Sequence, residues 1–269
     1  MKPIRLAASL TALALLAGCA RAPQPVHFFA AGYPEKLSDW HLVEARGGRL
    51  APNTGVVPYD LATPLFSDYA HKFRTVWMPQ GSAAKYDSYG PFDFPVGAIL
   101  TKTFFYPLPT NGNRNGKSVA RTWDTSRDFA PNAGHDALDL ANVRLIETRL
   151  LVRREGGWEA IPYVWDANQS DAHLARTGDV ITLELVDKQD KPEAFPYVVP
   201  NANQCAGCHV TNVQAKRIDP LGPHARHLNH DYDYATGKEN QLAHWVKAGY
   251  LTGLPSADVP RDAAWNDTR

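Results

Sequence analysis

The segment with the clearest chemical potential is residues 201–210, with the sequence NANQCAGCHV. It contains two of the three cysteines of the chain, Cys205 and Cys208, and His209 follows directly after the second. Cys-x-x-Cys-His is the pattern of c-type haem attachment, in which two thioethers hold the porphyrin and the histidine binds iron. Positions i, i+3 and i+4 share one face of a helical turn, so the three side chains can address one flat ligand. The pattern predicts one covalent haem c, with His209 as the proximal iron ligand.

Two other uses of these cysteines stay open. Cys205, Cys208, His224 and His230 match the ligand spacing of a Cys2His2 zinc finger. A finger of that kind needs a strand hairpin before its histidine helix, whereas two prolines occupy that stretch, and His209 would be left without a role. A thioredoxin-like redox dithiol needs a βαβ context, which the surrounding sequence does not indicate. Haem is therefore the favoured interpretation, with zinc as its alternative.

The ligand on the other side of the iron is less well defined by the sequence. Many electron-transfer cytochromes c use methionine there, but apart from Met1 the chain has only Met78, far upstream. His244 lies near the apolar face of the helical pattern QLAHWVKAG, and His224 and His227 would be presented together by one helical turn. We expect His244 as the distal ligand, ahead of His224, His227 or Met78. An iron left open on this side would indicate ligand chemistry rather than electron relay.

The N-terminal sequence MKPIRLAASLTALALLAGC indicates export and lipid attachment. Lys2 and Arg5 precede an apolar run that is too short to span a bilayer and is typical of a secretory signal. The run ends in LAGC, which resembles the bacterial lipoprotein box and implies that residues 1–18 are removed and Cys19 is lipidated. Several acyl chains on one residue anchor a protein stably. Ala20, by the same resemblance, favours the outer membrane, and an ordinary signal peptide containing a cysteine is the alternative.

The cysteine count and the compartment agree with haem attachment. Once Cys19 is assigned to lipid, Cys205 and Cys208 are the only thiols left for chemistry. Exported proteins usually spend cysteines on disulfides, but a bond across two intervening residues would close a very small loop and stabilise little. Haem of the c type is attached outside the cytoplasm, so we expect a periplasmic location.

Charge and composition narrow the class of protein. Lys and Arg number 28 against 28 Asp and Glu, so no basic surface for nucleic acid is predicted. A hydrophobic content of 44% is typical of a globular protein, and 21 prolines argue for many turns and against a helical bundle. We therefore expect contact with the membrane through the lipid anchor and no nucleic-acid partner.

The elements that must position the haem site are predicted to be mainly β. Residues 19–36 are rich in Ala and Pro and predict a tether, and residues 37–200 alternate β-branched or aromatic runs with turn clusters. An EGG turn between two of these runs predicts a hairpin. We expect an antiparallel sandwich or barrel-like domain. Its predicted strands cover residues 72–78, 99–107, 143–154, 157–165 and 179–187.

The C-terminal part, residues 201–269, has a different character. The patterns over residues 204–214 and 239–253 predict short helices joined by a polar loop, with Gly249 and Gly253 as stop signals. This haem c segment would make the chain α+β overall, with a short, mostly α piece following the β-rich domain.

Several segments together resemble an uncharacterised family of exported bacterial c-type cytochrome proteins, whose members have one or two haems and are often encoded near parallel β-helix proteins. The resemblance covers nearly the whole mature chain and implies haem at Cys205, Cys208 and His209, without a substrate. Relatives commonly continue into a second Cys-x-x-Cys-His segment, which this sequence does not contain, so we expect one haem on this chain, with a second haem on another polypeptide as the alternative. The segments are YPEKLSDW, VVPYDLATPLFSDYAHKFRTVWMPQG, FDFPVGAILTKTFFYP, IETRLLV with GWEAIPYVWDANQSDA, and YVVPNANQCAGCH.

These observations predict a lipid-anchored periplasmic mono-haem c-type cytochrome that exchanges one electron with a partner oxidoreductase. The β-rich domain would be the docking platform for that redox partner. The alternatives are a haem enzyme or a redox or gas sensor with an open iron, and a zinc-binding exported lipoprotein. The sequence has no His-Glu-x-x-His helix and no Gly-x-Ser-x-Gly elbow, which favours an electron carrier over a catalyst and leaves the enzyme question open.

Overall fold

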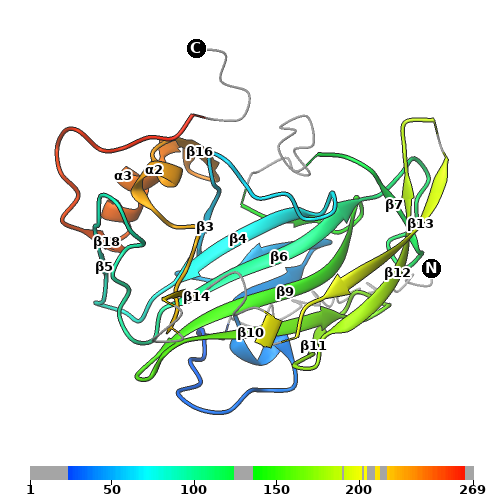
Figure 1. Cartoon of the computed structure of the whole chain (residues 1–269), viewed down its shortest axis with the longest axis horizontal. Coiled ribbons are helices and arrows are strands. Elements are labelled where there is room, and N and C mark those ends of the chain that lie inside the picture. The colour runs from blue at the N-terminus through cyan, green and yellow to red at the C-terminus, as the bar shows by residue number, and fades with distance from the viewer. Residues whose placement is uncertain are drawn as a thin grey trace, which may run out of the picture.

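The computed structural model describes residues 24–123, 136–189, 191–201, 203–204, 210–212 and 217–263. Its architecture is mainly β, as the sequence predicts, and its centre is a six-stranded antiparallel sheet in the order β11-β10-β9-β6-β4-β3 (Figure 1). The strands are β3 (Val57–Tyr59), β4 (His71–Trp77), β6 (Ile99–Pro107), β9 (Val143–Arg154), β10 (Gly157–Trp165) and β11 (Ala172–Leu174).

The longest strands form the predicted hairpin. Arg154 of β9 pairs with Gly157 of β10, so Glu155 and Gly156 make a two-residue turn. Gly157 has a φ of 127°, a left-handed value that a residue with a side chain would adopt only under strain. The hairpin, like the strands predicted over residues 72–78, 99–107 and 179–187, is confirmed.

Smaller sheets and short helices surround the large sheet. The pairs β7–β12 and β5–β18 are parallel, and the remaining strand pairs are antiparallel. One three-stranded sheet joins β1 (Val43–Arg46), β2 (Arg49–Pro52) and β8 (Leu138–Asp139), and another joins β7 (Ser118–Ala120), β12 (Asp179–Val186) and β13 (Pro192–Val199). The two-stranded pairs are β5 (Ala84–Lys85) with β18 (Leu251–Thr252), β14 (Val210–Asn212) with β15 (Arg217–Ile218), and β16 (Asp231–Tyr234) with β17 (Gly237–Asn240). The helices are η1 (Leu37–Trp40), α2 (Ala225–Leu228) and α3 (Gln241–Lys247).

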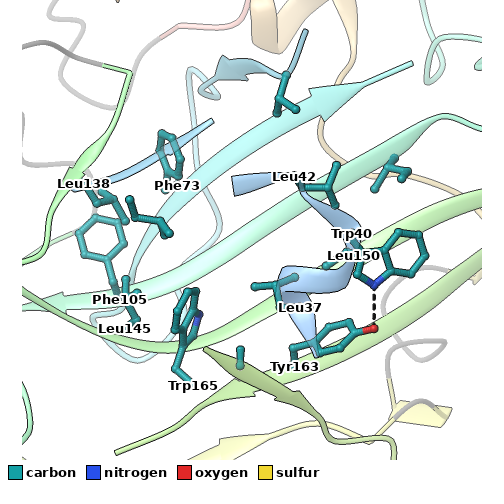
Figure 2. Packing of buried hydrophobic residues seen from close by; sticks show 14 of the residues in the cluster. Leu37, Trp40, Leu42, Phe73, Phe105, Leu138, Leu145, Leu150, Tyr163 and Trp165 are labelled. Carbon is teal, nitrogen blue, oxygen red and sulfur yellow. Dashed lines mark hydrogen bonds between the residues drawn. The ribbon is translucent and has the colours of Figure 1, made fainter. Parts of the chain in front are cut away.

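One face of the large sheet is covered by the N-terminal part of the chain. Trp40 of η1 is fully buried there, and its Nε1 donates a hydrogen bond to the hydroxyl of Tyr163, 2.8 Å away (Figure 2). Burial of apolar side chains between the N-terminal segment and the sheet is the main contribution that stabilises this packing. We call this packing the first cluster; it includes Leu37, Trp40, Leu42, Phe73, Ile99, Phe105, Leu145, Leu150, Ile161, Tyr163 and Trp165.

The opposite face carries two further clusters, one at each end. Figure 1 shows α2 and α3 at one end of the large sheet and β7, β12 and β13 at the other. The second cluster joins sheet residues such as Val76 and Leu100 to C-terminal residues such as Leu228, Leu242 and Trp245. The third cluster joins Phe104, Tyr106 and Ile146 to Leu183, Leu185, Tyr197 and Val199. The C-terminal segment therefore shares its core with the β-rich domain.

Helix α3 begins and ends for local reasons. The side chain of Asn240 accepts hydrogen bonds from the backbone N–H groups of Leu242 and Ala243, which is a standard N-cap. Gly249, with a φ of 76°, follows the helix and permits the left-handed turn that stops it. The helix is shorter than the predicted span of 239–253, because β18 takes up Leu251 and Thr252.

Two sequence predictions need correction. The tether was predicted to reach residue 36, but Val26, Phe28, Phe29 and Tyr33 pack against the first cluster, so the chain from Val26 onward belongs to the packed molecule. The helix predicted over residues 204–214 does not extend to its end, because residues 210–212 form strand β14. Backbone pairing with β15 satisfies hydrogen bonds there that a helix would have satisfied internally.

Candidate functional site

The predicted haem-attachment residues Cys205, Cys208 and His209 lie outside the described residues, as does the predicted lipidation site Cys19. The chain on either side of the motif is described. Strand β13 ends at Val199, which is buried in the third cluster, and α2 begins at Ala225, which is buried in the second. The segment that contains the motif therefore joins two clusters on one face of the large sheet. Strand β15, a few residues after the motif, lies against β10 of that sheet.

His244 has the environment expected of an oriented metal ligand. Its Nδ1 lies 2.9 Å from Oε2 of Glu239, and its ring stacks on Tyr234 with 3.6 Å between centroids and 12° between planes. The hydrogen bond from His244, assisted by Lys247, lowers the pKa of Glu239 below its usual value, so this carboxylate is an acceptor at neutral pH. An Nδ1–H that donates to a carboxylate leaves Nε2 with its lone pair, and iron-binding and zinc-binding histidines commonly have such a partner.

His224 and His227 are brought together by one helical turn, as the sequence predicts. Their ring centroids are 5.9 Å apart, with His224 at the N-cap of α2. Burial lowers the pKa of both imidazoles, which favours their neutral, ligating form. His227 Nδ1 lies 3.0 Å from Oδ2 of Asp262, but neither this buried nitrogen nor the buried Nδ1 of His224 forms a hydrogen bond with the described residues. The pair remains a second candidate for the distal side.

Met78 follows β4, at a strand end as expected, and is 1% exposed. It is part of the second cluster, where Trp245 and Leu242 also pack. A thioether enclosed in this way fills the core. Met78 would have to leave that packing to bind iron, so it is the weakest of the four distal candidates.

The zinc alternative can be followed only on its histidine side. His230 Nδ1 lies 3.0 Å from the carbonyl oxygen of Asp231, and its Nε2 lies 3.0 Å from Nε2 of Gln241. Within the described ranges, no group of three or more His, Cys, Asp or Glu side chains is placed to hold a metal ion. The two cysteines that would complete a zinc site lie outside those ranges.

Comparisons of the chain with protein-family models, with curated proteins and with solved structures found no match. None of the helices in the described part of the chain has the length and apolar character needed to cross a bilayer.

Sequence reasoning placed His244 on a helix but missed the two residues that orient it. Glu239 and Tyr234 belong to the β16–β17 hairpin, directly before α3. The turn between β16 and β17 places both residues beside α3, and its only signal in the sequence was Gly237. Recognition of that turn would have brought Tyr234 and Glu239 together as neighbours of the helix.

Proposed function

We propose that this protein is a lipid-anchored periplasmic mono-haem c-type cytochrome that passes single electrons to or from a partner oxidoreductase. The observation that carries the proposal is the Cys-x-x-Cys-His motif in a chain with an export signal and only two thiols besides Cys19. The C-terminal segment, residues 201–269, would carry the haem. Cys19 would attach the molecule to the outer membrane.

The chain's own residues fit the group that this function requires. Cys205 and Cys208 would hold it by thioethers, and His209 would bind one side of the iron. The haem supplies a one-electron iron couple when it is bound. His244 is the residue best prepared for the other side, because Glu239 holds the proton at its Nδ1 and leaves Nε2 available.

Glu239 and Tyr234 would position His244 rather than touch the iron. The Glu239 carboxylate sets the tautomer, and the stacked ring of Tyr234 fixes the imidazole plane. A histidine that donates to a carboxylate is a more basic ligand, which favours ferric over ferrous iron. A group whose pKa is lowered in the folded state contributes stability above its unfolded pKa and loses it as the pH falls. The ligand is therefore held best at neutral pH and loosened in acid.

The spectrum of the matured protein tests this function against its rivals. Two histidine ligands predict a low-spin, six-coordinate ferric haem whose ferrous form does not bind carbon monoxide. That result, with a reversible one-electron titration, supports an electron carrier. A high-spin ferric spectrum with rapid carbon monoxide binding would instead favour an enzyme or sensor with an open iron. A colourless protein that binds zinc would overturn the proposal.

A further inference from the structure

Three basic residues lie directly opposite one another across the centre of the large sheet. Arg74 of β4 pairs with Lys102 of β6, and Lys102 pairs with Arg149 of β9. Residues opposite each other in antiparallel strands have Cβ atoms about 5 Å apart, and like charges in such positions are destabilising. Lys72 points to the same face, two residues before Arg74. We call Lys72, Arg74, Lys102 and Arg149 the basic row.

The basic row lies between the second and third clusters. On β6, Leu100 of the second cluster and Phe104 of the third flank Lys102 on the same face. Two members of the row are withdrawn from solvent, Lys72 at 9% and Arg74 at 3% exposed, whereas Lys102 and Arg149 are half-buried. Charges in such a position are expensive unless they are paired.

Asp60 and Glu147 pair with members of the row. Arg74 Nη1 lies 2.6 Å from Oδ1 of Asp60. Arg149 donates to both oxygens of Glu147, at 2.7 and 2.5 Å, and Tyr197 donates to the same carboxylate at 2.6 Å. Glu147 is thus already engaged by a guanidinium and a phenol.

Lys102 differs from its neighbours. Its Nζ lies 5.2 Å from the centroid of the Phe104 ring, and across the described residues it forms no hydrogen bond or ion pair. The pKa of Lys102 is lowered to about 7, first by burial and then by the charges of Arg149, Arg74 and Lys72, against which Glu147 acts more weakly. An anionic group beside Nζ would offset the free-energy cost of keeping this ammonium charged next to other cations. The row therefore has the character of a binding site for carboxylates.

Described residues on either side of the haem motif lie at this face of the sheet. Val199 is buried in the third cluster and Ala225 in the second, so the segment that contains the motif connects the two clusters that flank the row. Strand β15 lies against β10, and β10 is the neighbour of β9 in the large sheet (Figure 1). A haem has an apolar macrocycle with two carboxylates at one edge, which matches a basic strip bordered by apolar clusters.

We propose that the basic row binds the haem propionate carboxylates and that Lys102 is the cation their charge completes. This inference rests on the proposed function. It adds a positioning role for residues of the β-rich domain, outside the haem-attachment segment. It also predicts that Lys102 tunes the reduction potential, because a nearby cation stabilises the ferrous state, which carries one more negative charge.

The test is the midpoint potential of the haem-loaded Lys102→Gln variant, with Lys188→Gln as its matched control. Lys188 is exposed, so its substitution removes the same charge away from the row. At pH 6 we expect Lys102→Gln to lower the equilibrium constant for one-electron reduction about tenfold, which is about 59 mV. Lys188→Gln should leave the potential near that of the native protein. Equal potentials in the two variants would overturn the inference.

A second measurement keeps the inference testable if Lys102→Gln does not mature. The potential of the native protein should fall as the pH rises from about 7 to about 10, because Lys102 loses its proton in this range. The charged groups that face it are Arg74 and Lys72 on β4 and Arg149 and Glu147 on β9. A potential that does not change over this range would contradict the role of Lys102.

A free carboxylate is the other possible occupant of the row. Succinate or inorganic phosphate, added to the haem-loaded protein, should not raise its melting temperature if the propionates already fill the site. Stabilisation by either anion that disappears in Lys102→Gln would assign the row to a diffusible anion and overturn the inference. Failure of the proposed function is distinguishable, because the chain would then contain no covalent haem in which to measure a potential.

Discussion

At the scale of single residues, the proposed function depends on which side chain would face His209 across the iron. His244 is the best prepared, because Glu239 fixes its tautomer and Tyr234 its plane. His227 is held in a different way, by contact with Asp262, and Met78 is enclosed in the second cluster. The sequence could predict the helix and its histidine, but not the partners of His244, because these depend on the return of the β16–β17 hairpin.

The distal ligand can be identified by substitution. His244→Ala should convert a low-spin ferric spectrum to a high-spin one, because one strong ligand is replaced by water or an empty position. His227→Ala is the matched control and should remain low-spin. The readout is the ferric absorption spectrum of both haem-loaded variants. The assignment of His244 is wrong if its variant stays low-spin, and a high-spin His227→Ala protein would move the assignment to His227.

At the scale of elements, helix α3 is attached to the β-rich domain by two buried side chains. Leu242 and Trp245 belong to the second cluster. The rings of Trp245 and Tyr59 form a T-shaped contact, with 5.6 Å between centroids. Nε1 of Trp245 is buried and has no hydrogen-bond partner among the described residues. Trp245 therefore acts through its packing volume and not through a polar contact.

The stability of this attachment can be measured. Trp245→Ala should lower the free energy of unfolding by about 3 to 5 kcal/mol, because it leaves a large cavity in the core. Trp245→Phe should cost much less, because no hydrogen bond is lost with the indole. Val246→Ala, at a position 44% exposed, is the control on the same helix. Urea unfolding would contradict this account if Trp245→Ala and Val246→Ala were equally stable.

The same scale shows which parts of the fold were readable in the sequence. Strands β4, β6, β9, β10 and β12 follow directly from β-branched and aromatic runs bounded by turns. The basic row was not readable, because Arg74, Lys102 and Arg149 are far apart in the chain and meet only through strand register. The predicted tether failed for a related reason, since Val26 and Phe28 find apolar partners only after the large sheet forms.

At the scale of the whole molecule, the predicted haem segment and the β-rich domain form one packed unit. The second cluster contains residues from β4 and β6 and also from α2 and α3, and β18 pairs with β5. In the proposed arrangement the haem lies against the large sheet, and its potential would respond to charges on β4, β6 and β9. The motif itself was predicted from sequence alone; the described residues add an oriented histidine and a row of basic side chains, which we propose lie near it.

The central claim is that haem is joined covalently to Cys205 and Cys208. The most direct test is to produce the full chain in a host that attaches c-type haem, unfold it, and separate it on a denaturing gel stained for haem. The account predicts a haem band at the position of the polypeptide, lost in Cys205→Ala/Cys208→Ala and retained in Lys188→Gln. A native polypeptide that migrates without haem under these conditions would contradict it.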